Sequence, residues 1–151
     1  MAGDGRRSIP FPDGPLPEPW PRLFALAAAA YTAVLLYATH HPKPGELVGV
    51  PLPADKVLHF VAYGLLGAAV GAAVAARGGW RGRAAAVWLA GLAVFAALDE
   101  ATQPIFGRYA DVRDWVFDGI GLVLGLAAVS LVVALARRRS RAPGQSRARG
   151  Q

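Results

Sequence analysis

Residues 115–136 read WVFDGIGLVLGLAAVSLVVALA, an apolar run of 22 residues that contains a single charged side chain, Asp118. A helix needs roughly 20 residues to cross a hydrocarbon core of about 30 Å, so this run predicts a transmembrane helix. Three further apolar runs lie at 23–39, 57–76 and about 80–98, and each is long enough to cross or nearly so. The sequence therefore predicts an all-α fold, an integral membrane four-helix bundle within residues 22–136.

The composition agrees with a membrane protein. Hydrophobic residues make up 54% of the 151 residues and charged residues 17%, a balance outside the usual range of soluble domains. The net charge of +6 does not indicate nucleic-acid binding, because the arginines stand at the ends of the apolar runs and form no basic face. The chain has no cysteine, which excludes thiolate zinc sites, thiol nucleophiles and disulfides, and no cofactor is predicted.

The basic residues predict the orientation in the membrane. Twelve of the sixteen lysines and arginines lie before the first run, between the second run and the fully apolar part of the third, which begins at Ala84, or after the fourth. Because such residues favour the cytoplasmic side, both termini are predicted to be cytoplasmic, in a multi-pass protein of the cell membrane. Residues 1–21, which contain six prolines, and the basic residues 137–151 are predicted to be disordered flanks, the latter in contact with anionic lipid.

Acidic residues gather on the opposite, external side. The stretch 99–121 reads DEATQPIFGRYADVRDWVFDGIG and holds five of the chain's ten acidic residues. Side chains three or four positions apart share one face of a helix, so three helix ends are expected to bring polar groups to the same membrane boundary. The groups with this spacing are Asp55, His59 and Tyr63 in the second run, Asp99 and Gln103 after the third, and Asp111, Asp114 and Asp118 at the fourth.

A carboxylate one turn inside an apolar span costs on the order of 1–3 kcal/mol, so Asp118 is expected to face the bundle and to have a partner. Arg108 is the first candidate partner for Asp114 or Asp118, and His59 is the second. The alternative interpretation treats these charges as helix caps and solvated loop charges at the membrane interface, with Asp55 as an N-cap.

Glycines form small-residue stripes in the second and fourth runs. Such stripes let transmembrane helices approach closely, so the two runs are expected to touch, which would place His59 near Asp118. A homodimer formed through a stripe is a second expectation. The glycines with this spacing are Gly64, Gly67 and Gly71 in the second run and Gly121 and Gly125 in the fourth.

The segments DKVLHFVAYGLLG (55–67) and DEATQPIFGRYADVRDWVFDGIGLVLG (99–125) resemble the VanZ-like family. Its pattern is D-K-x-x-H-x-x-x-Y, then D-E-x-x-Q, then R-x-x-D-x-x-D-x-x-x-N-x-x-G-x-x-x-G. One position departs from this pattern, because Asp118 stands where the family often has asparagine and adds an acid to the cluster. The matching positions are Asp55, Lys56, His59, Tyr63, Asp99, Glu100, Gln103, Arg108, Asp111, Asp114, Gly121 and Gly125.

The resemblance implies an action at the cell surface, because the family is named for a membrane protein associated with low-level resistance to teicoplanin. One hypothesis is binding of, or protection against, an amphiphilic envelope molecule, either a cell-wall lipid or a lipidated glycopeptide. A second is a membrane hydrolase or transferase that acts on an envelope lipid, with His59 and a carboxylate as general base or with a metal ion held by His59, Asp114 and Asp118. A third is a structural scaffold. Transport is less favoured, because the inner half of the runs lacks polar residues, and an acyl-enzyme is disfavoured because the outer cluster has no serine.

Overall fold

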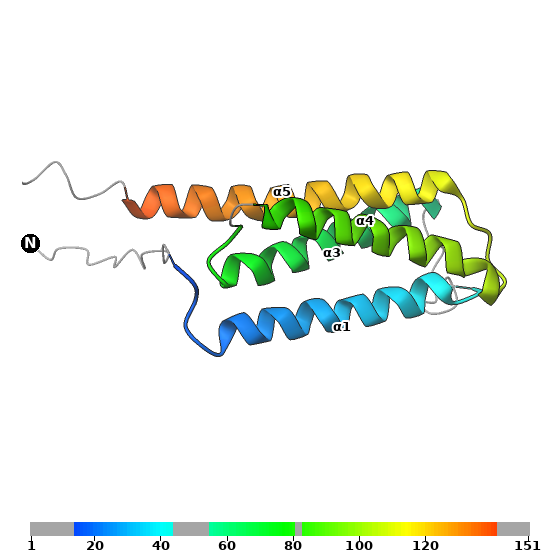
Figure 1. The fold of residues 1–151 in the computed structure, drawn as a ribbon, viewed down its shortest axis with the longest axis horizontal. Coiled ribbons are helices and arrows are strands. Elements are labelled where there is room, and N and C mark those ends of the chain that lie inside the picture. Colours follow the sequence, from blue (N-terminus) through cyan, green and yellow to red (C-terminus); the bar gives the residue numbers. More distant parts are fainter. Residues whose placement is uncertain (1–13, 44–54, 81–82, 142–151) are drawn as a thin grey trace, which may run out of the picture.

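The structure is a computed structural model, and every regular element that it describes is helical. The predicted all-α fold is therefore confirmed. It contains four long helices, and Figure 1 shows them lying roughly along the long axis of the molecule. The described residues are 14–43, 55–80 and 83–141. The elements are α1 (Trp20–His40), α3 (Asp55–Ala76), α4 (Ala84–Thr102), the 3-10 helix η1 (Gln103–Phe106) and α5 (Val112–Arg141).

All four long helices are able to cross a membrane. Taken with η1 at the end of α4, they supply apolar spans of 21 to 29 residues, which is enough for the hydrocarbon core of a bilayer. Their outer faces carry large apolar side chains, such as Leu26, Val34, Val87 and Val123, that are exposed on the surface of the bundle. Contact with lipid costs these apolar faces no free energy, whereas contact with water does. The chain is a multi-pass membrane protein.

The bounds of the helices differ from the predicted runs at several points. The third helix begins at Ala84 and not near residue 80. Before it, Gly78 and Gly79 adopt left-handed φ values of 102° and 90° in the turn that follows α3. Trp80 lies in this connection, where its indole N–H donates to the Ser130 hydroxyl at 3.3 Å. Pro21 sits in the first turn of α1, where the missing N–H costs no helical hydrogen bond.

Two helices extend into the flanks that were predicted to be disordered, residues 1–21 and 137–151. The first of these ranges includes the start of α1 at Trp20, and the second includes the last turn of α5, which continues to Arg141. Within these ranges the chain is therefore helical where α1 starts and where α5 ends. The predicted disorder of 1–13 and 142–151 lies outside the described residues.

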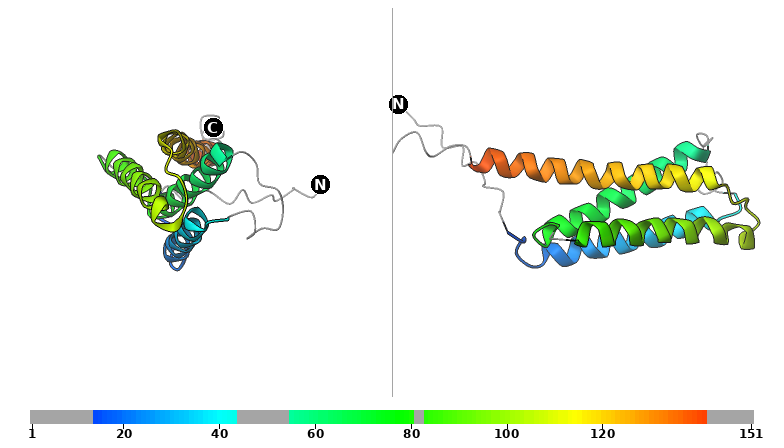
Figure 2. Two further views of the ribbon diagram at one scale, coloured as in Figure 1. Left: turned by 90° about the vertical axis from the view of Figure 1, so that its right-hand side faces the viewer. Right: turned by 45° about the horizontal axis from the view of Figure 1, so that its top comes forward.

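Successive helices run in opposite directions, so four helix ends meet at each end of the bundle (Figures 1 and 2). We call one of these the polar end: it contains the end of α1, the start of α3, η1 and the start of α5. The opposite end contains the start of α1, the end of α3, the start of α4 and the end of α5, and we call it the basic end because arginines cluster there. The described chain thus enters and leaves the bundle at the basic end.

The largest helix interface joins α3 and α5. The two backbones cross so closely that a Cβ atom added at Gly121 would overlap the backbone oxygen of Phe60, and one added at Gly125 would overlap that of Gly64. Only glycine fits such an approach. At Gly71, farther along α3, an added Cβ would meet the Val129 side chain at 3.3 Å.

Gly67 continues the same crossing, because a Cβ there would overlap the backbone of Leu122. Leu122 is completely buried at this point, together with Leu66 and Tyr63 of α3. The core of the bundle is therefore built around the glycine crossing. On α3, the turn that precedes Tyr63 brings His59 against α5.

Candidate functional site

One buried polar contact at the polar end joins α3 and α5. His59 Nδ1 lies 2.9 Å from Asp118 Oδ1, and both side chains are buried, with Asp118 completely inaccessible to solvent. This contact depends on the glycine crossing beneath it, because a wider spacing of α3 and α5 would pull the two side chains apart. His59 is thus the partner of the one acid that lies within the apolar run of α5.

Lys56 makes a second link between the same two helices, one turn nearer the surface. Its Nζ lies 3.3 Å from Asp111 Oδ2 and 3.5 Å from Asp114 Oδ1. Asp111 also caps α5, because its Oδ1 accepts a hydrogen bond of 2.8 Å from the backbone N–H of Arg113. That N–H and the Lys56 ammonium hold the pKa of the Asp111 carboxyl below its ordinary value.

Glu100 ties the end of α4 to the start of α5. Its Oε1 accepts a 2.6 Å hydrogen bond from the backbone N–H of Asp111, and its Oε2 accepts one of 3.1 Å from Gln103 Nε2. Glu100 and Gln103 are both buried. A buried carboxylate with two hydrogen bonds is better stabilised than a bare one, but its charge still has to be balanced.

Asp99 ties α4 to α1 and α3. The Tyr63 hydroxyl donates to its Oδ2 at 2.7 Å, and the Thr39 hydroxyl donates to its Oδ1 at 2.8 Å. His40 Nδ1 lies 3.4 Å from the same Oδ1, and His40 Nε2 lies 2.9 Å from the Thr102 hydroxyl. The buried carboxylate of Asp99 therefore has partners on two other helices.

Thr39, His40 and Thr102 were absent from the predicted cluster. The signal that would have found the first two is their place at the end of an apolar run, on the same membrane boundary as Asp99. Thr102 lies in the quoted stretch 99–121 but is not part of the resembling pattern.

Arg108 does not pair with Asp114 or Asp118, so that prediction is wrong. Its Nη2 lies 3.2 Å from Asp55 Oδ1, and its Nη1 donates to the backbone oxygen of Thr39 at 3.1 Å. The reason is the path of the chain: Gly107 adopts a left-handed φ of 78° after η1, and Arg108 then faces the ends of α1 and α3. Asp55 is the first residue of α3.

The structure brings all of the predicted cluster to the polar end, on α3, α4, η1, α5 and the connection between η1 and α5. Ser130 and Ser140, the serines among the described residues, lie farther along α5 toward the basic end. The described part of the polar end therefore holds no serine nucleophile. The predicted cluster comprises Asp55, Lys56, His59, Tyr63, Asp99, Glu100, Gln103, Arg108, Asp111, Asp114 and Asp118.

A groove of about 750 Å³ runs between α1 and α4 and reaches the cluster. Its polar lining includes His40, His41, Asp99 and Thr102, and the rest of its lining is mainly apolar. Since the groove lies on the outer surface of two membrane-spanning helices, it faces the lipid. The apolar part is lined by side chains that include Leu36, Tyr37, Phe95, Leu98, Ile105 and Phe106.

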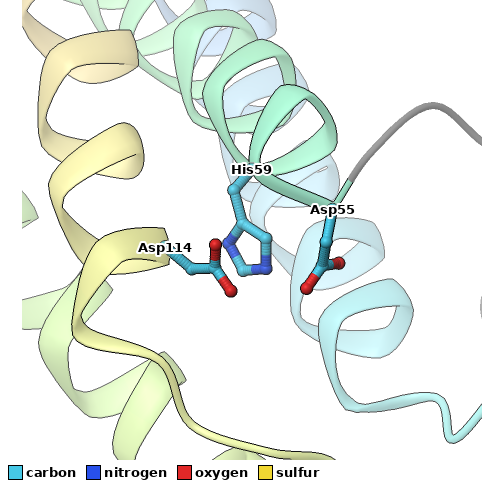
Figure 3. Close-up of side chains that lie close together, drawn as sticks. All are labelled: Asp55, His59 and Asp114. Atoms are coloured by element: carbon cyan, nitrogen blue, oxygen red, sulfur yellow. The ribbon is translucent and has the colours of Figure 1, made fainter.

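Two overlapping trios at the polar end have the residue types and spacing to hold a metal ion. One consists of Asp55, His59 and Asp114, and Figure 3 shows the His59 ring between the two carboxylates. The other consists of His59, Glu100 and Asp118, which are all buried. In each trio the ligand atoms lie within 4.8 Å of one another.

The sequence profile described as VanZ/LLP1 matches residues 20–133. The chain belongs to the VanZ/LLP1 family. The matched region begins with α1 and ends within α5, so it contains every described residue of the polar end. No curated protein and no solved structure matches the chain.

Proposed function

We propose that this VanZ/LLP1 protein binds an amphiphilic molecule of the cell envelope, either a lipid-linked cell-wall intermediate or a lipidated glycopeptide such as teicoplanin. The observation that supports this proposal is the groove between α1 and α4. It offers polar groups and an apolar, lipid-facing wall in one continuous surface. A molecule with a polar head and an acyl or prenyl tail fits such a surface, since each part meets groups of its own polarity.

The head group is expected to lie where His40, Asp99 and Thr102 line the groove. Arg108 lies at the outer rim of this region, because it contacts the backbone of Thr39, the residue before His40. The tail would follow Leu36 and the apolar wall of α4 toward the middle of the bundle.

Binding is favoured over catalysis by the state of His59. It was the candidate general base, but it is buried, it is bonded to Asp118, and it does not line the groove. A scaffold without a ligand is the other alternative, and the hydrogen bonds that join α1, α3, α4 and α5 agree with it. That alternative gives the groove no role, so an experiment that changes the groove distinguishes ligand binding from a scaffold.

The proposed ligand requires the polar end to face outward. Twelve of the sixteen basic residues support this orientation, with both termini in the cytoplasm. A reporter fused after Arg139 should then read cytoplasmic, and one inserted near Gly45 should read external. The opposite pair of signals would place the polar end in the cytoplasm and refute an external ligand.

The groove is tested by filling it. Leu98 lines the groove and is 60% exposed, so Leu98→Trp adds bulk there without entering the core. Val94, one turn earlier on the same face of α4 and 59% exposed, does not line the groove, and Val94→Trp is the matched control. In a susceptible bacterium, the wild type and Val94→Trp should raise tolerance to teicoplanin more than to an unlipidated glycopeptide, and Leu98→Trp should not.

Binding is measured directly with the purified protein in nanodiscs and a fluorescent teicoplanin. Leu98→Trp should lower the affinity by about tenfold or more, since it removes the apolar part of the contact. Equal tolerance and equal affinity for the wild type and a folded Leu98→Trp would refute the groove as the binding site of a lipidated glycopeptide.

A further inference from the structure

His59, Glu100 and Asp118 form a compact trio on three different helices. One is a ring nitrogen donor and two are carboxylates, and their ligand atoms lie within 4.8 Å of one another. All three side chains are buried. The trio does not line the groove between α1 and α4, so a ligand of the trio would be distinct from the amphiphile proposed above.

One oxygen of the trio is left without a partner. Asp118 Oδ1 is bonded to His59, but within the described residues the buried Asp118 Oδ2 has no hydrogen-bond partner. A buried carboxylate oxygen without a partner is costly and is rare in folded proteins. This oxygen points to a ligand that the protein chain itself does not supply.

The charges around the trio point the same way. Among the described residues, neither Glu100 nor Asp118 forms an ion pair with a lysine or an arginine. Lys56 is engaged by Asp111 and Asp114, and Arg108 is engaged by Asp55. His59 is thus the one basic side chain in the trio with these two buried carboxylates. A cation between them would balance their charge.

The donor set defines the kind of cation. Each oxygen of Glu100 accepts one hydrogen bond and keeps a lone pair, and Asp118 Oδ2 keeps both. Carboxylate oxygens with one imidazole suit a divalent ion such as Mn²⁺ or Zn²⁺. We infer that His59, Glu100 and Asp118 bind one divalent metal ion between α3, α4 and α5. The ion joins these helices at the polar end and is independent of the proposed amphiphile.

The inference is tested by titrating Mn²⁺ into the purified full-length protein in detergent micelles and following free Mn²⁺ by electron paramagnetic resonance. The wild type should bind one equivalent. Asp118→Asn is isosteric, and its side-chain oxygen still accepts a hydrogen bond from His59, so the fold should persist. Its Mn²⁺ affinity should fall by more than about 100-fold, since even the outer-shell partners of metal ligands are worth roughly 10- to 100-fold.

Further variants locate the ion. Glu100→Gln should weaken Mn²⁺ as strongly as Asp118→Asn does, and Glu18→Gln, at the opposite end of the bundle, should bind like the wild type. Mn²⁺ should also raise the melting temperature of the wild type and leave that of Asp118→Asn unchanged. Size-exclusion chromatography verifies that each variant is folded.

Three results would overturn the inference. The first is a wild type that binds neither Mn²⁺ nor Zn²⁺, which would mean that a proton balances the carboxylates. The second is a folded Asp118→Asn that binds Mn²⁺ like the wild type. The third is loss of binding in Asp55→Asn with full binding in Glu100→Gln, which would assign the ion to Asp55, His59 and Asp114.

Discussion

The two ends of the bundle carry charge in opposite ways. At the polar end, Asp99, Glu100, Asp114 and Asp118 are buried between helices. At the basic end, arginines such as Arg83, Arg138 and Arg139 are exposed at the helix ends. Because buried charges need partners and exposed ones do not, the acids determine how the helices contact one another. The exposed arginines have no such constraint, so they do not determine which helices touch.

The largest loss of stability is expected when the partner of a buried charge is removed. His59→Leu leaves Asp118 without its hydrogen bond, and we expect a loss of about 3–5 kcal/mol in the free energy of unfolding. The matched change at the basic end, Arg138→Leu, should stay within about 0.5 kcal/mol. Unfolding by sodium dodecyl sulfate in mixed micelles, with a chelator present, measures both. The double variant His59→Leu, Asp118→Leu should recover most of the loss, and equal effects of the two single variants would refute the comparison.

A smaller effect is expected where the helices cross beneath the polar end. Gly121→Ala forces α3 and α5 apart at the Phe60 backbone, and overpacking of this kind costs about 1–3 kcal/mol. Gly119 lies two residues away on α5 with no atom within 4 Å of an added Cβ, so Gly119→Ala is the control and should be close to neutral. The same unfolding assay compares them. A neutral Gly121→Ala would show that the crossing is wider than described.

The smallest effect concerns the rim of the polar end. The Asp55 side chain is 51% exposed, so its pairing with Arg108 should contribute only about 0.2–1 kcal/mol. A double-mutant cycle with Arg108→Ala and Asp55→Ala measures this coupling, which should weaken as salt is added. The parallel cycle with Arg108→Ala and Asp118→Asn should give no coupling energy. A coupling confined to the second cycle would restore the partner first predicted for Arg108.

The sequence predicts the fold well because each helix is coded locally. An apolar run of sufficient length specifies a membrane span whatever its neighbours are, and the four runs match the four helices. The third run was predicted to begin near residue 80, whereas α4 begins at Ala84, after a turn with left-handed φ values at Gly78 and Gly79 that hydropathy does not report. The glycine spacing was more informative than hydropathy about contacts between helices, since it indicated that α3 and α5 touch and that His59 lies near Asp118.

The partner of Arg108 was not predictable in the same way. Arg108 has a long side chain on a connection, and its direction depends on η1 and on the left-handed turn at Gly107. Those conformations follow from tertiary packing and not from a periodic pattern. Thr39 and His40 were missed for a related reason, because their role depends on which helix lies beside the end of α1.

The contact between His59 and Asp118 also has a consequence for how the protein enters the membrane. His59 precedes Asp118 by 59 residues, and synthesis proceeds from the N-terminus, so α3 leaves the ribosome before α5. We therefore expect His59 to be in the bilayer before α5 is inserted, so that Asp118 can pair with it as it leaves water. The reverse order would leave the acid unpaired in lipid until the histidine followed, at a cost in free energy that the present order avoids.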